Sequence, residues 1–194
     1  MLHSQSIQAR FIQACRRAWD CGLLAGCNGN ISIRLGRHCL ITRSGAAKGH
    51  LSLKDLLRVN LHSGAYQPLA GHRACGLPSS ELGMHLALYA ARSETRAIVH
   101  VHPARLLALS LRVPPDKFVS LPLFEAEKAR EQLAFVPALP PGSAELAQAV
   151  AQAACQADAV WMQGHGLTCL GTSLQAALAL AEELEHLAGV QLLL

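Results

Sequence analysis

The spacing of apolar positions predicts helices at both ends of the chain and between them. Apolar side chains recur every three to four residues over residues 6–23, as in an amphipathic helix. Several serines stand where they can cap a helix, because a serine side chain accepts a backbone N–H of the first turn. Five further helices are expected: a short one over residues 52–57, one from near Ser79-Ser80 to Arg92, one over residues 104–110, one from Ser143 to about Gln156, and one from Ser173 towards Gly189.

Short runs with a two-residue alternation, or with only apolar residues, predict strands. Residues 31–35 alternate strictly, and residues 39–42 follow as the second strand of a hairpin. Residues 97–102 form a third strand, and Ala159–Met162 is expected to be a buried one. Residues 113–141 hold most of the nine prolines and give no clear period. Helices and strands mix without a strict β-α-β rhythm, which favours an α/β fold whose sheet contains antiparallel pairs covered by helices.

Length and composition change this picture little. A chain of 194 residues, 51% hydrophobic and 15% charged, is long enough for one domain with its own core, so we expect a single domain over residues 1–194. Intrinsic disorder is excluded by the same composition. The longest stretch without a charged residue, 159–181, contains Gln163, Gly164 and Gly171, so no transmembrane segment is expected.

The expected location is the cytoplasm. Seven cysteines are an odd number without a C-x-x-C pair, which argues against a disulfide framework and a thiolate zinc ribbon. The first ten residues also lack the charged-then-apolar order of a signal peptide.

Charge is unevenly distributed along the chain. Residues 1–112 carry 14 Lys and Arg against 4 Asp and Glu, whereas residues 113–194 carry 3 against 9. A basic half is typical of proteins that bind nucleic acid or a small anion. Because the basic residues are scattered and only eight aromatic residues are available for base stacking, we expect a small anionic ligand and no nucleic acid.

Candidate chemistry begins with His100 and His102. Residues i and i+2 of a strand point to the same face, so the two imidazoles converge, as in half of a Zn²⁺ site. His165, between Gly164 and Gly166, is the candidate third ligand. The alternatives are two exposed histidines at a strand end and a histidine in an ordinary loop.

Glu81 is the candidate acid/base. It stands at the start of a predicted helix, where a carboxylate either serves as a general acid/base beside a metal or only stabilises the helix N-terminus. His85 is expected in the core or behind the ligands, on the same helix face. Three turns with small, donor-rich residues are candidates for an anion pocket; they contain Gly29 and Asn30, Ser44 and Gly45, and Ser79 and Ser80.

The order of these motifs resembles the class II aldolase/adducin-like family. The matching pieces are G-N-I-S at 29–32, S-G at 44–45, S-S-E-L-x-x-H at 79–85, H-V-H-P at 100–103 and Q-G-H-G at 163–166. Together they span about residues 8–190. The resemblance implies a three-layer α/β/α fold with a mostly antiparallel central sheet, and a homotetramer with active sites at subunit boundaries.

The resemblance also implies the roles of the site residues. It places a divalent metal, usually zinc, on His100, His102 and His165, with Glu81 as the acid/base. It assigns the phosphate of a small sugar or sugar acid to the residues that match the family's phosphate site, namely Asn30, Ser44, Gly45, Ser79 and Ser80.

The activity implied first is that of a zinc-dependent lyase, which cleaves a small sugar phosphate by aldol chemistry through a metal-stabilised enediolate. Dehydration, decarboxylation and 4-epimerisation of a related sugar or sugar-acid phosphate share this intermediate and stay open. The rival from another class is a non-catalytic, adducin-like scaffold domain.

The chain departs from the family pattern at two places. Cys27 stands where aldolases often have Thr or Ser. The family's aldolases also use tyrosines after the H-x-H strand, whereas both tyrosines here precede it, and Glu125 and Glu127 are candidate replacements.

Overall fold

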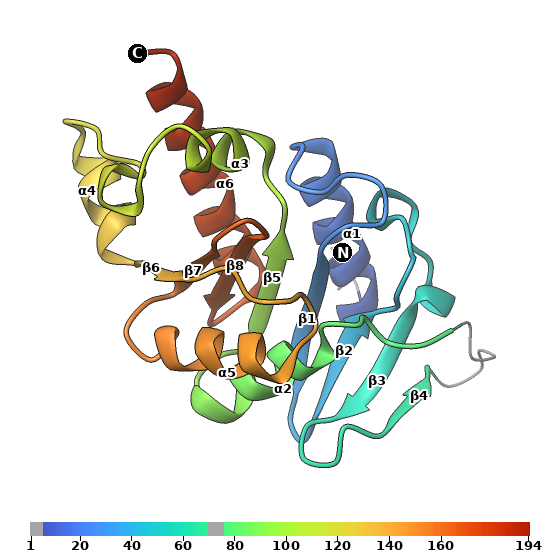
Figure 1. Cartoon of the computed structure of the whole chain (residues 1–194). Coiled ribbons are helices and arrows are strands. Elements are labelled where there is room, and N and C mark those ends of the chain that lie inside the picture. Colours follow the sequence, from blue (N-terminus) through green and yellow to red (C-terminus); the bar gives the residue numbers. More distant parts are fainter. Residues whose placement is uncertain (1–5, 70–75) are drawn as a thin grey trace.

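An eight-stranded sheet forms the middle of the molecule in the computed structural model, which describes residues 6–69 and 76–194 (Figure 1). Neighbouring strands run antiparallel except for β6 and β7, which are parallel. In spatial order the strands are β4 (Tyr66–Pro68), β3 (Leu56–Asn60), β2 (His38–Thr42), β1 (Asn30–Leu35), β5 (Ala97–Val101), β8 (Gly166–Gly171), β7 (Ala159–Met162) and β6 (Leu133–Val136). The expected α/β class with a mostly antiparallel sheet is confirmed.

Helices cover both faces of the sheet. On one face lie α1 (Ile7–Asp20), α3 (Ala104–Ser110), α4 (Phe124–Glu131) and α6 (Leu174–Leu192). On the other face lie α2 (Leu82–Ala91) and α5 (Ala144–Ala153). Because side chains of a strand alternate, β5 sends Val99 into the first core and Ile98 into the second. The three layers implied by the resemblance are therefore present.

The predicted serine caps of the two C-terminal helices are confirmed. The side chain of Ser143 accepts the backbone N–H of Leu146 over 3.1 Å at the start of α5. The side chain of Ser173 accepts that of Ala176 over 3.1 Å at the start of α6. The strands expected at 31–35, 39–42, 97–102 and 159–162 are also present, within a residue of the predicted limits.

The helix predicted over residues 52–57 is wrong beyond its first turn. Ser52 and Asp55 form a capping box around the 3₁₀ turn Leu53–Asp55, but Leu56 already begins β3. Leu56 enters one core and Leu57 the other, which is the alternation of a strand buried on both faces.

Helix α2 begins at Leu82, later than the predicted start at Ser79-Ser80. The reason is a short extended segment: Pro78 forms a β-bridge with Arg43, and the backbone N–H of Ser79 donates to the Thr42 carbonyl. The buried residues of α2 are Met84, His85, Leu88 and Tyr89, while Leu82 and Leu86 are half-buried.

One α-helix and four strands were not predicted: α4, β3, β4, β6 and β8. Helix α4 buries only Ala126 and Ala129, so it carries no stripe of large apolar residues. Strands β4 and β6 have three and four residues. Strand β8 is bounded by glycines, which indicate turns in a sequence.

Two expectations about composition are met within the described residues. No helix there combines the length and the apolar character that a membrane span requires. The six cysteines of residues 6–69 and 76–194 are free thiols, and Cys75 lies outside these residues.

Candidate metal centre

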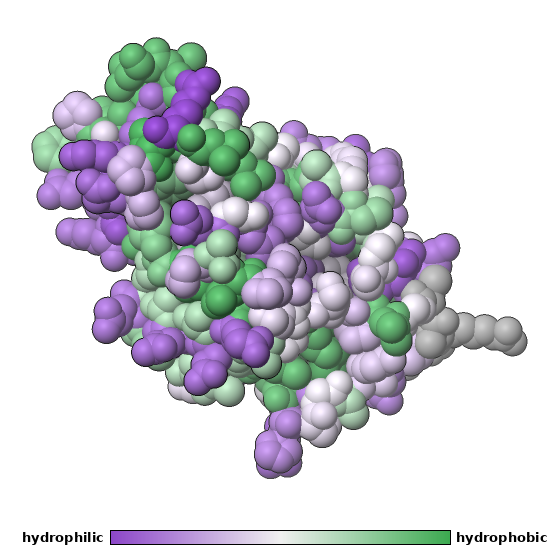
Figure 2. All heavy atoms as spheres, in the orientation of Figure 1, coloured by the Kyte–Doolittle hydropathy of each residue, from purple (hydrophilic) through white to green (hydrophobic). Residues whose placement is uncertain are grey.

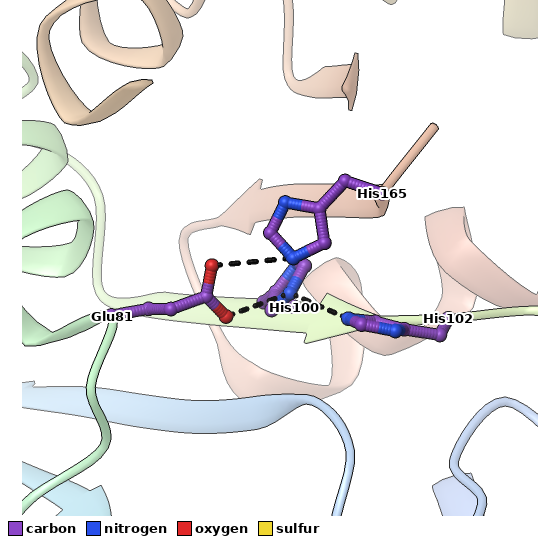
Figure 3. Close-up of side chains that lie close together, drawn as sticks. All are labelled: Glu81, His100, His102 and His165. Atoms are coloured by element: carbon purple, nitrogen blue, oxygen red, sulfur yellow. Dashed lines mark hydrogen bonds and ion pairs between the residues drawn. The ribbon is translucent and has the colours of Figure 1, made fainter. Parts of the chain in front are cut away.

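Four side chains from three parts of the fold converge at one point (Figure 3). Glu81 is the residue before α2, His100 lies in β5, His102 directly follows that strand, and His165 lies in the turn between β7 and β8. One ligand atom from each lies within 4.8 Å of the others. The predicted convergence of the three histidines and Glu81 is therefore present in the fold.

The three imidazoles pack edge to face. Their ring centroids are 4.8 Å apart for His100 and His102, 4.9 Å for His100 and His165, and 5.1 Å for His102 and His165. Nε2 of His100 lies 3.0 Å from Nε2 of His102. The i, i+2 spacing on β5 places these two rings side by side, as the sequence predicts.

The hydrogen bonds of His100 test whether a cation fits. Nδ1 of His100 donates to the Leu167 carbonyl over 3.0 Å, so the lone pair that this ring can offer to a cation is that of Nε2. This lone pair faces Oε2 of Glu81 at 3.0 Å as well as the His102 ring. Such acceptors repel one another unless a cation lies among them. Three histidines and one carboxylate are donors that bind a divalent ion, so the residues fit the divalent metal that the sequence resemblance implies.

Burial keeps the candidate ligands in their metal-binding forms. Burial, together with the neighbouring His100 and His165, lowers the pKa of His102 to about 4. Burial, followed by the neighbouring His100, also holds the pKa of His165 below its ordinary value. Burial alone would raise the pKa of Glu81, but contacts with His100 and the Asn30 amide outweigh it and hold that pKa well below the usual range. At neutral pH, His102 and His165 are therefore neutral and Glu81 is ionised.

Two glycines allow the close packing around this cluster. A Cβ on Gly166 would lie 2.6 Å from the Val101 carbonyl oxygen and 3.0 Å from a ring carbon of His102. A Cβ on Gly29 would lie 2.6 Å from the His100 carbonyl oxygen, and its φ of +68° is itself one that favours glycine. The φ of Gly166 is not positive, so the need for space beside the imidazoles is what favours glycine here.

The three turns expected to form an anion pocket lie against one another. The thiol of Cys27, in the turn before Gly29 and Asn30, donates to the Gly45 carbonyl over 3.3 Å. The backbone N–H of Ser44 donates to the Leu77 carbonyl over 2.9 Å, which ties the second turn to the third. The third turn contains Ser79, whose hydroxyl accepts the backbone N–H of Glu81, and the exposed Ser80.

Lys48 is a buried cation beside these turns that the sequence analysis did not single out. Its side chain is only 2% exposed, and Nζ donates to the Cys27 carbonyl over 2.6 Å. Burial lowers the pKa of Lys48. None of the ion pairs between described residues includes Lys48. In the sequence, Lys48 could have been found from the pattern S-G-x-x-K that begins at Ser44.

Behind Glu81 lies a chain of buried polar residues that the sequence did not connect, although it placed His85 in the core and Asn30 in the anion pocket. Asn30, Ser32, His85 and Tyr89 are all buried, and hydrogen bonds link them in series to Glu81. Asn30 and Ser32 are two residues apart on β1, and His85 and Tyr89 are four residues apart on α2, so each pair shares one face of its element. This spacing was the signal in the sequence. Glu125 and Glu127, the candidate replacements for tyrosine, are exposed on α4.

Comparison with known proteins agrees with this geometry. The family described as Class II Aldolase and Adducin N-terminal domain matches residues 9–192. An L-fuculose phosphate aldolase of Methanococcus maripaludis is 34% identical over 178 residues, covering 92% of each chain. A methylthioribulose-1-phosphate dehydratase of Sodalis glossinidius is also 34% identical, again covering 92% of each chain. The crystal structure of L-fuculose-1-phosphate aldolase from Thermus thermophilus superposes with a TM-score of 0.77 at 28% identity, covering 95% of this chain and 92% of that one. The chain therefore belongs to the class II aldolase and adducin N-terminal domain family and is one of its metal-dependent enzymes.

Proposed function

We propose that this enzyme is a zinc-dependent lyase that cleaves a small sugar phosphate by a retro-aldol reaction. The observation that carries the proposal is the cluster of Glu81, His100, His102 and His165, whose ligand atoms lie within 4.8 Å of one another. The substrate class is supported by the names of the two relatives, each of which contains a sugar phosphate.

His100, His102 and His165 would hold the metal, which supplies Lewis-acid stabilisation of negative charge on the substrate oxygens. In a retro-aldol reaction a hydroxyl proton leaves, the adjacent carbon–carbon bond breaks, and its electron pair passes to the carbonyl fragment, which is then protonated. Glu81 is ionised, buried and beside the histidines, so it is placed to take up a proton and return it.

The phosphate is assigned to the three contacting turns. Their small residues leave room for an anion, and their backbone N–H groups and hydroxyls supply donors. The proposed phosphate-binding residues are Gly29, Asn30, Ser44, Gly45, Ser79 and Ser80. The buried ammonium of Lys48, behind the first of these turns, adds positive charge and supports this assignment.

Dehydration is the second candidate reaction. A specific observation favours it: the dehydratase relative is as similar to this chain as the aldolase relative, at 34% identity. Both reactions need a base next to a metal-bound sugar phosphate, so Glu81 serves either one.

The products distinguish the two reactions. Metal-loaded protein would be incubated with L-fuculose 1-phosphate and with 5-methylthioribulose 1-phosphate, and the products would be resolved by mass spectrometry. Aldol cleavage gives dihydroxyacetone phosphate and an aldehyde, whereas dehydration gives one product that has lost water. Absence of both on a panel of ketose phosphates would reject the proposal.

The metal is checked separately from turnover. Metal analysis of purified protein is expected to give about one zinc ion per chain, and the variants His100→Ala, His102→Ala and His165→Ala are each expected to lose it. Zinc as the metal, a homotetramer, a cytoplasmic location and a single domain over residues 1–194 stay predictions.

A further inference from the structure

A ladder of four hydrogen-bonded side chains runs from the interior of the protein to Glu81. Asn30 and Ser32 stand two residues apart on β1, and His85 and Tyr89 stand four residues apart on α2. The four side chains alternate between the two elements: Tyr89 contacts Ser32 over 2.9 Å, Ser32 contacts His85 over 2.7 Å, and His85 contacts Asn30 over 2.5 Å. Asn30 then reaches Oε2 of Glu81 over 2.9 Å.

The direction of every bond in the ladder follows from Glu81. An ionised carboxylate only accepts hydrogen bonds, so Asn30 must present its NH₂ group to Oε2 and its carbonyl oxygen to His85. His85 must therefore donate from Nε2. The His85 ring is fully buried, and burial lowers its pKa to about 3, so it is neutral and its Nδ1 accepts.

The directions of the hydrogen bonds made by Ser32 and Tyr89 follow in the same way. The Ser32 hydroxyl has one hydrogen, which it donates to Nδ1 of His85, so its oxygen accepts from the Tyr89 hydroxyl. Every donor in the ladder thus points towards Glu81. Reversal would need the other tautomer of His85 and a flipped Asn30 amide, whose oxygen would then face the carboxylate.

The second carboxylate oxygen of Glu81, Oε1, has different contacts. Oε1 is buried and accepts no hydrogen bond from the described residues. Nε2 of His165 lies 3.3 Å from Oε1, but this contact lacks hydrogen-bond geometry. Figure 3 shows Oε1 and Oε2 turned towards different imidazoles.

We propose that the ladder Tyr89–Ser32–His85–Asn30 positions Glu81, so that Oε2 is held by the Asn30 amide and Oε1 is the oxygen that takes up and returns the substrate proton. This inference rests on the proposed function, in which Glu81 is the acid/base. His85 is a positioning residue because it acts through Asn30. Its role is to fix the orientation of the Asn30 amide, which fixes the carboxylate.

The tautomer of His85 tests the ladder without any substrate. In metal-loaded enzyme labelled with ¹⁵N-histidine, the resonances of His85 are assigned by their loss in His85→Gln. The expected result is one protonated nitrogen, Nε2, and one unprotonated nitrogen, Nδ1, at neutral pH. A proton on Nδ1, or on both nitrogens, would overturn the proposal.

Two variants of His85 test its effect on catalysis. His85→Gln keeps a donor and an acceptor, whereas His85→Phe keeps neither at similar volume. Residues behind a metal centre typically contribute about 10–100-fold, so His85→Phe is expected to lower kcat by that factor, with metal content unchanged and a smaller rise in KM, because Asn30 also contacts the phosphate in the proposed function. His85→Gln is expected to recover most of the loss. An unchanged kcat in His85→Phe, or an equal loss in both variants, contradicts positioning through hydrogen bonds.

Ser32→Ala provides the test if His85→Phe does not fold. It removes only the hydroxyl that donates to Nδ1, so His85 is expected to keep its proton on Nε2, where Asn30 accepts it, while the ring is held less firmly and kcat falls about tenfold. A kcat unchanged by Ser32→Ala, or a proton found on Nδ1 in this variant, would overturn the proposal. Because the tautomer is measured without substrate, a failure of the proposed function appears separately, as absence of turnover in the wild-type enzyme.

Discussion

The side-chain amide of Asn30 donates a hydrogen bond to Oε2 of Glu81 over 2.9 Å. Asn30 is the first residue of β1 and Glu81 precedes α2, so this bond joins the sheet to the helix layer at the metal centre. An asparagine amide has two hydrogens, and only one is used here. In the proposed function the second hydrogen is left for the phosphate, so the anion pocket and the acid/base share one residue.

Glu81→Gln is expected to keep the metal and lose turnover. Three histidines remain as ligands, but the amide cannot take up a proton. General acid/base groups contribute about 10²–10⁴-fold, so the loss should appear in kcat, with a smaller change in KM. Metal analysis and steady-state kinetics on the same preparation check this. Turnover equal to that of wild type would mean that Glu81 only stabilises the start of α2.

Gly166→Ala is expected to weaken metal binding. The added Cβ would lie 2.6 Å from the Val101 carbonyl oxygen and 3.0 Å from the His102 ring, so the turn that carries His165 must shift. Misplaced ligands typically cost about 10–100-fold in metal affinity. Competition with a chelator measures the change.

Gly83→Ala is the matched control for this test. Gly83 lies in α2, and a Cβ there would meet nothing within 4 Å. An alanine in a helix is favoured over glycine by about 0.5–1 kcal/mol, so this variant should keep its metal and be slightly more stable. Equal metal affinity in both variants would contradict the crowding argument.

Lys48→Met is expected to weaken phosphate binding. A hydrogen bond or close contact with a charged group contributes about 1.5–3 kcal/mol. The inhibition constant of inorganic phosphate should therefore rise about tenfold or more, and KM should rise by a larger factor than kcat falls. Lys54→Met is the control, since Lys54 is an exposed lysine in the neighbouring 3₁₀ turn. Equal inhibition of both variants would remove Lys48 from the anion pocket.

His85 is expected to make stability depend on pH. Burial lowers its pKa to about 3 in the folded protein, against about 6.5 in an unfolded chain. Between these values the unfolded state binds more protons, so stability is complete above about pH 6.5 and falls as the pH falls towards 3. The loss is about 1.4 kcal/mol for each pH unit within this window.

Urea unfolding of wild type and His85→Gln measures this contribution, because groups common to both proteins cancel. Between about pH 7 and about pH 5, the wild type should lose about 2 kcal/mol more than the variant. Parallel curves for the two proteins would mean that His85 is already protonated in the folded state.

The sequence predicted the elements that carry strong local signals. Residues 31–35 alternate strictly and form β1, and Ser143 and Ser173 cap helices as expected. It did not predict α4 or β8. Helix α4 buries two alanines and no large apolar residue, and β8 is paired with β5 and β7 by contacts that are distant in sequence.

The metal centre was more predictable than the residues that support it. His100 and His102 share a strand face by their spacing alone. The ladder from Tyr89 to Asn30 depends on the register between β1 and α2, which no local pattern specifies. Lys48 was missed for a similar reason, because its burial depends on how the loop at Cys27 folds over it.

The exposed end of α6 supports the predicted homotetramer. Figure 2 shows apolar side chains gathered at the end of the molecule where α6 ends. Leu193 is 88% exposed, Leu194 is 92% exposed, and Phe124 on α4 is 89% exposed. Such apolar area is costly to leave in water, and contact with neighbouring copies would bury it.

Sedimentation equilibrium is expected to give a tetramer of the 20.7 kDa chain at micromolar concentration. Phe124→Asp should shift the protein to smaller species, whereas Tyr66→Asp, on the edge strand β4 at the other end of the sheet, should not. A monomeric wild type, or an equal effect of both variants, would contradict assembly through this end of the molecule.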